Sequence, residues 1–308
     1  MDHRPTFKVT FLCPRYWGYW LLPLALSIVV LIPLRWRDPW LAACGRYLGR
    51  RLLRPRQRAS VNLCYCFPQW SEDYREQILD QMFATAAQVA IAMVELAVRS
   101  RSYLLTRIQI VGENHLTTLQ QQGKPILFFV PHVWGIDFAA VTLAALGLPM
   151  AAMIKPHPNP LIEWLSSRTR LRFGGRLYTR QQGLKPWTRA VRNGYLGYYL
   201  PDEDHGTDKS EFVDFFATYK ATLPVLAPLA KICRAEVLPL LPVYKTQQGA
   251  FELQIFPPMD FSTANTPNAV ARQLNQVIET LITPYPEQYL WVLKLLKTRK
   301  PRESMPYE

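Results

Sequence analysis

The sequence lacks the motifs of several large enzyme classes. It contains no G-x-x-x-x-G-K-[ST] and no G-x-G-x-x-G, so the phosphate-binding loops of nucleotide-dependent kinases and of dinucleotide enzymes are missing. No G-x-S-x-G is present either, which removes the nucleophile elbow of the α/β-hydrolases. These absences argue against phosphoryl transfer from a nucleotide, nicotinamide chemistry and serine-dependent hydrolysis.

Cysteines are few and are not arranged in pairs. An odd number, five, fits neither a disulfide framework nor a four-ligand zinc site. We therefore expect reduced thiols, no bound metal and no cofactor. The five are Cys13, Cys44, Cys64, Cys66 and Cys233.

Acidic residues are scarce relative to basic ones. The 308 residues include 23 Asp and Glu against 36 Lys and Arg, a formal net charge of +13. Such an imbalance attracts an anionic partner: phospholipid headgroups, a phosphorylated glycolipid or nucleic acid. With 49% hydrophobic and 19% charged residues, the chain can bury one large core. We expect one domain and an anchor.

The anchor is predicted near the amino terminus. Residues 17 to 34 carry no charge, and about 18 apolar residues are the lower limit for a helix that spans a bilayer. Aromatic residues flank this run on both sides, as at membrane interfaces. The sequence predicts a transmembrane anchor over residues 17 to 35, with a buried helix as the alternative because Pro23 and Pro33 interrupt the run.

Basic residues set the expected orientation. More of them follow the anchor than precede it, which predicts that residues 36 to 308 form a cytoplasmic domain behind a single membrane pass. The cluster at residues 46 to 58 (RYLGRRLLRPRQR) can attract anionic lipid. No recognisable nucleic-acid module accompanies it, so we expect no nucleic-acid partner.

The body reads as an α/β domain. Residues 71 to 98 repeat apolar positions at helical spacing, while 108 to 111 and 126 to 130 read as strands. Later apolar runs near 196 to 200, 235 to 244 and 251 to 256 are separated by helical stretches, and 268 to 282 and 287 to 298 look helical. This alternation predicts a central, mostly parallel sheet flanked by helices.

A histidine at the end of a buried strand is the sharpest chemical signal. His132 follows PILFFV directly, and Asp137 lies five residues later near the start of the next helix. If His132 occupies the turn, the Asp137 carboxylate can turn back and fix its tautomer, which makes a general base. The spacing alone is weak, and a structural histidine is the alternative.

A second polar cluster follows the strand near residue 200. In YYLPDEDHG, Asp202 and Asp204 stand beside Glu203 and His205; the readings are a metal site, which we disfavour, or an acidic loop paired with arginines. Five arginines lie between residues 168 and 180. Arginine binds phosphate in a bidentate manner, so one or two of them, with Arg170 and Arg180 favoured, are candidates for binding a phosphorylated substrate.

Longer strings carry a resemblance to a known family. The segments HVWGID, FGGRLYTR, YYLPDEDHG, SEFVDFFATYKATLP and EQYLWVLKLLKTRKP are similar to those of the late acyltransferases of lipid A biosynthesis, above all the myristoyltransferase branch. The resemblance runs from the anchor to the carboxyl-terminal tail. It implies a glycerolipid-acyltransferase-like α/β fold at the inner membrane.

The resemblance also implies a reaction and a set of roles. The donor would be acyl-acyl carrier protein, and the acceptor a hydroxyl of a hydroxyacyl chain on Kdo-lauroyl-lipid IVA, giving hexa-acylated lipid A. His132 and Asp137 would be catalytic, and Asp202 and Arg180 would lie in the family's second and third functional blocks. With Arg170 and Asp204, which stand near them in the sequence, they are the expected substrate-binding residues. A glycerophospholipid acyltransferase and a non-catalytic membrane adaptor remain the alternatives.

Overall fold

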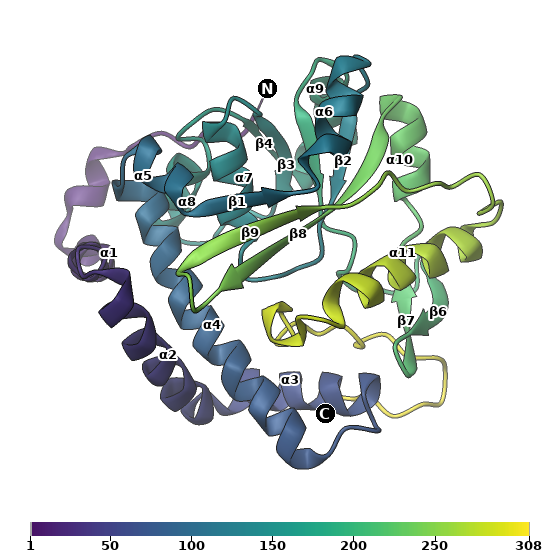
Figure 1. Ribbon diagram of the computed structural model, residues 1–308, viewed down its shortest axis with the longest axis horizontal. Helices are drawn as coiled ribbons and strands as arrows, with labels where there is room; N and C mark the ends of the chain where they lie inside the picture. Colours follow the sequence, from purple (N-terminus) through teal and green to yellow (C-terminus); the bar gives the residue numbers. More distant parts are fainter. Residues whose placement is uncertain (1, 308) are drawn as a thin grey trace.

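The computed structural model describes residues 2–307 and is built around a seven-stranded sheet, whose strands lie at the centre of the view in Figure 1. The strand order is β1-β9-β8-β2-β5-β3-β4. All neighbours are parallel except β8 and β9, which form an antiparallel pair. The prediction of a mostly parallel sheet is confirmed. The strands are β1 (Ile108–Val111), β2 (Ile126–Phe129), β3 (Met150–Ile154), β4 (Arg176–Thr179), β5 (Leu196–Tyr199), β8 (Glu236–Lys245) and β9 (Ala250–Ile255).

Helices cover both faces of this sheet. The central strand β2 is buried throughout, and its side chains alternate between two hydrophobic clusters. Leu127 and Phe129 face α9, α10 and α11, while Phe128 faces α7 and the end of α4. Burial on both faces explains why the strand reads as a continuous apolar run. The helices are α4 (Glu72–Val98), α5 (Arg101–Thr106), α6 (Glu113–Gln121), α7 (Ile136–Ala145), α8 (Pro160–Arg170), α9 (Leu184–Arg192), α10 (Leu226–Cys233) and α11 (Pro267–Ile282).

The amino-terminal segment differs from the predicted single helix over residues 17 to 35. Helix α1 (Trp17–Val29) ends early, and Pro33 is the N-cap of a separate helix, α2 (Leu34–Arg51), which runs alongside α4 (Figure 1). Proline fixes its own φ and disfavours helix at the residue before it, so the break lies where the sequence places it. By length and composition α4 is the one membrane-span candidate among the described residues, but 56% of its most apolar stretch is buried inside the protein.

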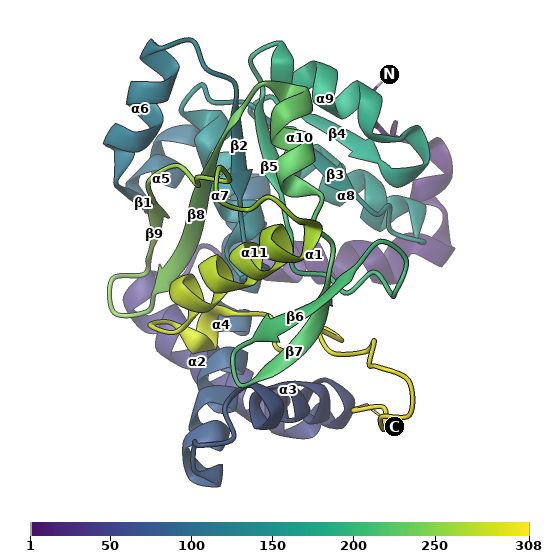
Figure 2. The same cartoon turned by 90° about the vertical axis from the view of Figure 1, so that its right-hand side faces the viewer.

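Two segments that follow β5 in the chain lie beside the carboxyl ends of the central strands. A small hairpin, β6 (Glu211–Phe215) and β7 (Thr218–Thr222), packs between α11 and α3 (Leu53–Cys66) (Figure 2). The helix predicted over 287 to 298 is wrong, because only a 3-10 turn at Pro286–Gln288 forms there. The backbone N–H of Leu290 instead donates to the carbonyl of His132 at 2.8 Å. This hydrogen bond to a residue far away in the sequence takes the place of the local hydrogen bonds of a helix.

Candidate active site

The carboxyl ends of β2 and β5 bring His132 and Asp202 together. The strands are parallel neighbours in which Phe129 pairs with Tyr199, and each polar residue follows three positions later. The backbone N–H of His132 donates to Oδ2 of Asp202 at 2.8 Å, and the ring Nδ1 bonds to Oδ1 of the same carboxylate. One buried carboxylate therefore holds both the backbone and the imidazole of the histidine.

Asp202 is ionised although it is fully buried. Burial by itself would raise its pKa, but the charge and hydrogen bonds of His132, with the charge of Lys220, hold the pKa at about 2. The Lys220 ammonium, also fully buried, donates to the backbone carbonyl of Asp202 at 2.7 Å. Burial in turn lowers the pKa of Lys220, and the charge of Asp202 opposes that shift.

The same surroundings tune His132. Burial lowers its pKa, but the charge and hydrogen bond of Asp202 and the charge of Glu203 outweigh burial, so the net shift is upward. Glu203 Oε1 lies 3.8 Å from Nε2, and Lys220 works in the opposite direction by lowering the pKa. With Nδ1 committed to Asp202, Nε2 is the nitrogen left to exchange a proton with a substrate.

The predicted contact between Asp137 and His132 is wrong. Asp137 lies in the first turn of α7, and its carboxylate forms a two-point ion pair with Arg170 of α8, Oδ1 to Nε and Oδ2 to Nη2, both at 2.8 Å. Burial lowers the pKa of Arg170, but the charge and hydrogen bonds of Asp137 outweigh burial and raise it. Arg170 therefore carries its charge at the site. Asp137 thus positions an arginine. Asp202 lies beside the histidine, in the place that was predicted for Asp137.

The other predicted site residues divide into two groups. Arg180 is exposed over 61% of its side chain and pairs with Glu203 at 2.6 Å, so it is available to a ligand. Asp204 is buried, and its oxygens accept from Gly206 N–H, Thr298 N–H and Thr298 Oγ1 at 2.7 to 2.9 Å. It braces the carboxyl-terminal segment, so we no longer expect Asp204 to bind substrate. Asp202 is fully buried and bonds through both oxygens to His132, so we propose that it acts on the histidine in place of binding substrate.

A cavity of about 500 Å³ opens beside His132. Its polar end holds His132, Asp137, Arg170, Arg180, Glu203 and His205. From there it extends along one face of α7, where Ile136, Ala140 and Ala144 recur every four residues, and is closed by Met150, Leu171 and the glycines at 174 and 175. Both glycines have positive φ, and a Cβ on Gly175 would lie 2.9 Å from the carbonyl of Met150. The cavity combines a charged mouth with an apolar interior.

Two residues of this site escaped the sequence analysis. Lys220 belongs to TYKAT, which reads as an ordinary polar strand, and only the hairpin fold shows that its side chain is buried beneath Asp202. Glu203 was considered only as part of an acidic loop, and its approach to Nε2 depends on the pairing of β2 with β5. Over residues 2–307, no group of three or more His, Cys, Asp or Glu side chains is placed to hold a metal ion.

Comparison with known proteins gives consistent matches. Residues 4–298 match the family of bacterial lipid A biosynthesis acyltransferases. The lipid A biosynthesis myristoyltransferase of Escherichia coli is 46% identical over 307 residues, covering 100% of this chain and 95% of that protein. A lipid A biosynthesis acyltransferase of Haemophilus influenzae is 45% identical, covering 97% and 93% of the two chains. The lauroyltransferase of Escherichia coli is 30% identical, with 97% of each chain covered.

Proposed function

Because the chain belongs to the bacterial lipid A biosynthesis acyltransferases, we propose that it transfers a fatty acyl chain from acyl-acyl carrier protein to a hydroxyl of a hydroxyacyl chain on Kdo-lauroyl-lipid IVA. The product would be hexa-acylated lipid A. The observation that carries the proposal is the buried carboxylate and histidine at the mouth of an apolar cavity. Such a site suits a long acyl chain and a base beside it.

His132 acts as the general base. Nε2 takes the proton from the acceptor hydroxyl while that oxygen attacks the thioester carbonyl carbon of the donor. The carbon–sulfur bond then breaks, and the carrier thiolate leaves with the proton that His132 has held. The products are an ester and a free carrier thiol, and no covalent enzyme intermediate is required.

Asp202 is the positioning residue for this base. Its bond to Nδ1 fixes the tautomer that leaves Nε2 free to accept, and its negative charge stabilises the imidazolium formed during the reaction. The catalytic role predicted for Asp137 becomes indirect: it fixes Arg170 in the cavity. Two nitrogens of Arg170 bond to Asp137, and its remaining donors can face a developing oxyanion or a phosphate.

Arg180 and the apolar interior supply recognition. Arg180 is an exposed guanidinium at the charged mouth and can bind a phosphate of the sugar acceptor or of the carrier's phosphopantetheine. The face of α7 formed by Ile136, Ala140 and Ala144 would lie along the acyl chain. We propose myristoyl as the transferred chain because of the identity to the myristoyltransferase.

The test is mass spectrometry of lipid A from cells that lack the protein. Wild type should restore one additional acyl chain, His132→Ala should not, and His115→Ala, on the distant helix α6, should behave as wild type. Equal restoration by both histidine variants would remove His132 from the mechanism. A glycerophospholipid acyltransferase with the same base is the alternative, and acylation of lysophospholipid in place of the lipid A precursor by the purified enzyme would favour it.

Lipid A biosynthesis enzymes act on a membrane lipid, and we place this chain at the cytoplasmic face of the inner membrane. The surface charge agrees, since the net charge of +13 favours both an anionic membrane and an acidic carrier protein.

A further inference from the structure

We infer that α1 and α2 lie flat in the headgroup layer of an anionic bilayer, with both ends of α1 on the same side of the membrane as the catalytic domain. The inference rests on the proposed membrane placement and is independent of the catalytic mechanism. It replaces a single-pass anchor with a surface-bound pair of helices.

Helix α1 is short for a membrane span. Its 13 residues extend about 20 Å at 1.5 Å per residue, whereas the hydrocarbon core is about 30 Å thick. A turn follows, and α2 begins with Arg35 and Arg37 in its first turn. The charge-free run of the sequence is thus divided between a short helix and a turn.

The chain preceding α1 is bonded to the catalytic domain. The backbone N–H of His3 donates to the carbonyl of Leu177 in β4 at 2.6 Å, and its ring Nε2 lies 2.8 Å from Glu163 of α8. Phe11 and Tyr16 are buried against Leu161 of the same helix. A helix that crossed a bilayer would carry these residues to the opposite side, so every one of these contacts would be lost.

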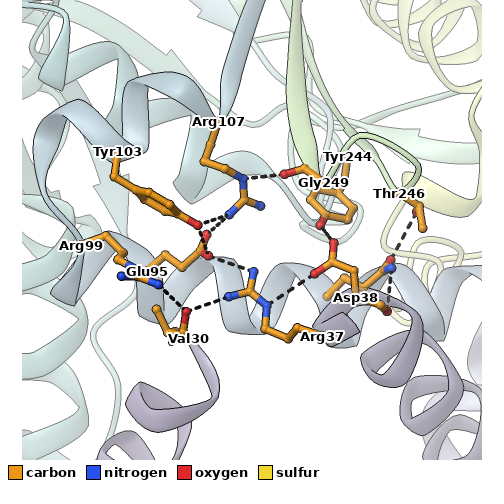
Figure 3. A network of polar contacts seen from close by, with 11 residues as sticks. Val30, Arg37, Asp38, Glu95, Arg99, Tyr103, Arg107, Tyr244, Thr246 and Gly249 are labelled. Atoms are coloured by element: carbon orange, nitrogen blue, oxygen red, sulfur yellow. Dashed lines mark hydrogen bonds and ion pairs between the residues drawn. The ribbon is translucent and has the colours of Figure 1, made fainter. Parts of the chain in front are cut away.

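The other end of α1 is bonded as well. The carbonyl of Val30 accepts from Arg99 at 2.7 Å and from Arg37 at 3.4 Å (Figure 3). Arg37 is itself buried and paired with Glu95 of α4 at 2.8 Å. Separating α1 from the domain would remove this acceptor from both guanidinium groups, one of which is buried, and that loss is unfavourable.

The buried network continues from α4 to the sheet (Figure 3). Glu95 also pairs with Arg107, which donates to the carbonyl of Gly249, and Asp38 of α2 accepts from the hydroxyl of Tyr244 in β8. Both amino-terminal helices are therefore bonded to the core and form one layer against α4.

Helix α2 is held by close backbone packing. A Cβ added at Gly45 would lie 2.3 Å from the carbonyl of Phe83 in α4, and one at Gly49 would lie 2.4 Å from the Phe83 ring. Only glycine permits this approach. The inner face of α2 is therefore occupied by α4, and its outer face is directed away from the protein.

The outer surface of this layer is apolar and basic. Of the 25 large hydrophobic side chains exposed on the described protein, 17 lie between residues 7 and 53. Every exposed charged residue between positions 7 and 54 is basic, because the only acidic residue there, Asp38, is buried. The basic ones are Lys8, Arg15, Arg35, Arg46, Arg50, Arg51 and Arg54.

This combination fits a bilayer surface. Exposed leucines and isoleucines can enter the acyl boundary, tryptophans such as Trp17, Trp36 and Trp40 prefer the interface, and the arginines attract anionic headgroups. The layer also adjoins the site: Trp164 of α8 packs against the segment before α1, and α8 ends at Arg170 and Leu171, which line the cavity. A lipid acceptor could reach the cavity from the membrane plane.

The native cysteines provide the test. Cys13 precedes α1 and Cys64 belongs to the body, and both are exposed. One variant keeps Cys13 (Cys44→Ser, Cys64→Ser), and its control keeps Cys64 (Cys13→Ser, Cys44→Ser). Each is treated with a membrane-impermeant maleimide in intact spheroplasts and in inverted inner-membrane vesicles. Both cysteines should react in the inverted vesicles alone; reaction of Cys13 in spheroplasts, with Cys64 protected, would overturn the inference.

Lipid could shield Cys13 in both preparations. A second variant, Thr6→Cys in a chain that lacks Cys13, Cys44 and Cys64, then reports the side of the membrane from an exposed residue further from α1. The assay needs no catalysis, so a failed acyltransferase proposal would leave its outcome unaffected.

A binding assay tests the anionic partner. Arg35→Gln, Arg51→Gln and Arg54→Gln in one chain should weaken binding to vesicles containing phosphatidylglycerol by roughly fivefold for each arginine removed. The matched control, Arg192→Gln, Lys231→Gln and Arg234→Gln, removes the same exposed charge from α9 and α10. Equal losses in the two variants would contradict a role for this surface, as would unchanged binding of the first.

Discussion

Two aspartates flank the active site, and they differ in almost every physical respect. Asp202 is fully buried, bonds to both nitrogens that His132 presents to it, and has a pKa of about 2. Asp137 is 24% exposed at its side chain and makes a two-point ion pair with Arg170. In the proposed mechanism, one carboxylate sets the protonation state of the base, and the other fixes a cation that faces the substrate.

The difference separates two kinds of catalytic contribution. A carboxylate on the base acts on the rate of proton transfer, whereas a carboxylate on an arginine acts on binding and on charge in the transition state. Nearness in sequence does not decide which is which. Asp137 lies five residues from His132, yet the partner of the histidine comes from 70 residues away.

The largest effect is expected from Asp202→Asn. The amide can reverse the hydrogen-bond polarity at Nδ1 and favour the wrong tautomer, so kcat should fall on the order of 10³ to 10⁴-fold. Asp137→Asn is the matched variant, because it removes the same charge nearby without contacting the histidine. Steady-state kinetics with acyl-acyl carrier protein would measure both; a larger loss of kcat in Asp137→Asn would reverse the two roles.

Arg170→Lys should have the next largest effect. Lysine retains the charge but cannot form the planar two-point pair with Asp137, so the cation loses its fixed direction. We expect kcat/KM to fall by about 100-fold, the cost of misplacing a catalytic group by roughly 1 Å. Arg168→Lys, on the same helix, is the control. Unchanged kinetics in Arg170→Lys would exclude a role for the Arg170 guanidinium in catalysis or binding.

Ala144→Phe tests the apolar end of the cavity. Ala144 is 5% exposed and lines the wall formed by α7, so a phenyl ring there should shorten the accepted chain. Competition between lauroyl and myristoyl donors should shift toward lauroyl by about 10-fold, the selectivity typical of one or two methylenes. Leu146→Phe, beyond the cavity on an exposed surface, should leave chain preference unchanged. If the rate falls and the chain preference does not change, the acyl chain does not lie along this wall.

The smallest effect, on the limiting rate at high pH, is expected from Lys220→Met. The base must be neutral to act, and the raised pKa of His132 places the acid limb of the rate profile above 6.5. Lys220 lowers the pKa of His132, so removing its charge should raise that pKa and move the acid limb to higher pH. Rates at high pH should change by less than about threefold if methionine fills the site. A limb that moves to lower pH would contradict the charge argument.

The sequence predicts much of this site because burial leaves a clear pattern. The continuous apolar run of β2 located His132, and the alternation of strands and helices predicted the sheet. Arg170 and Arg180 were favoured only as cationic phosphate ligands, and both line the cavity. The resemblance of the longer strings gave the family.

What the sequence could not supply is strand order. His132 meets Asp202 because β2 and β5 are neighbours, an arrangement set by crossovers that no local pattern encodes. Asp204 was predicted to bind substrate as part of the polar cluster after a strand, but its oxygens accept hydrogen bonds from the carboxyl-terminal Thr298. The burial of Lys220 is also tertiary in origin, since it comes from docking of the separate β6–β7 hairpin.

The most direct test of the central claim is a nitrogen NMR titration of the His132 ring in wild type, Asp202→Asn and Asp137→Asn. Spectra of a His132→Gln chain would identify the resonances. The account predicts a neutral form protonated at Nδ1 in wild type, with a pKa above 6.5 that falls in Asp202→Asn and is unchanged in Asp137→Asn. A fall in Asp137→Asn with no change in Asp202→Asn would show that Asp137 is the partner of the base and would contradict the account.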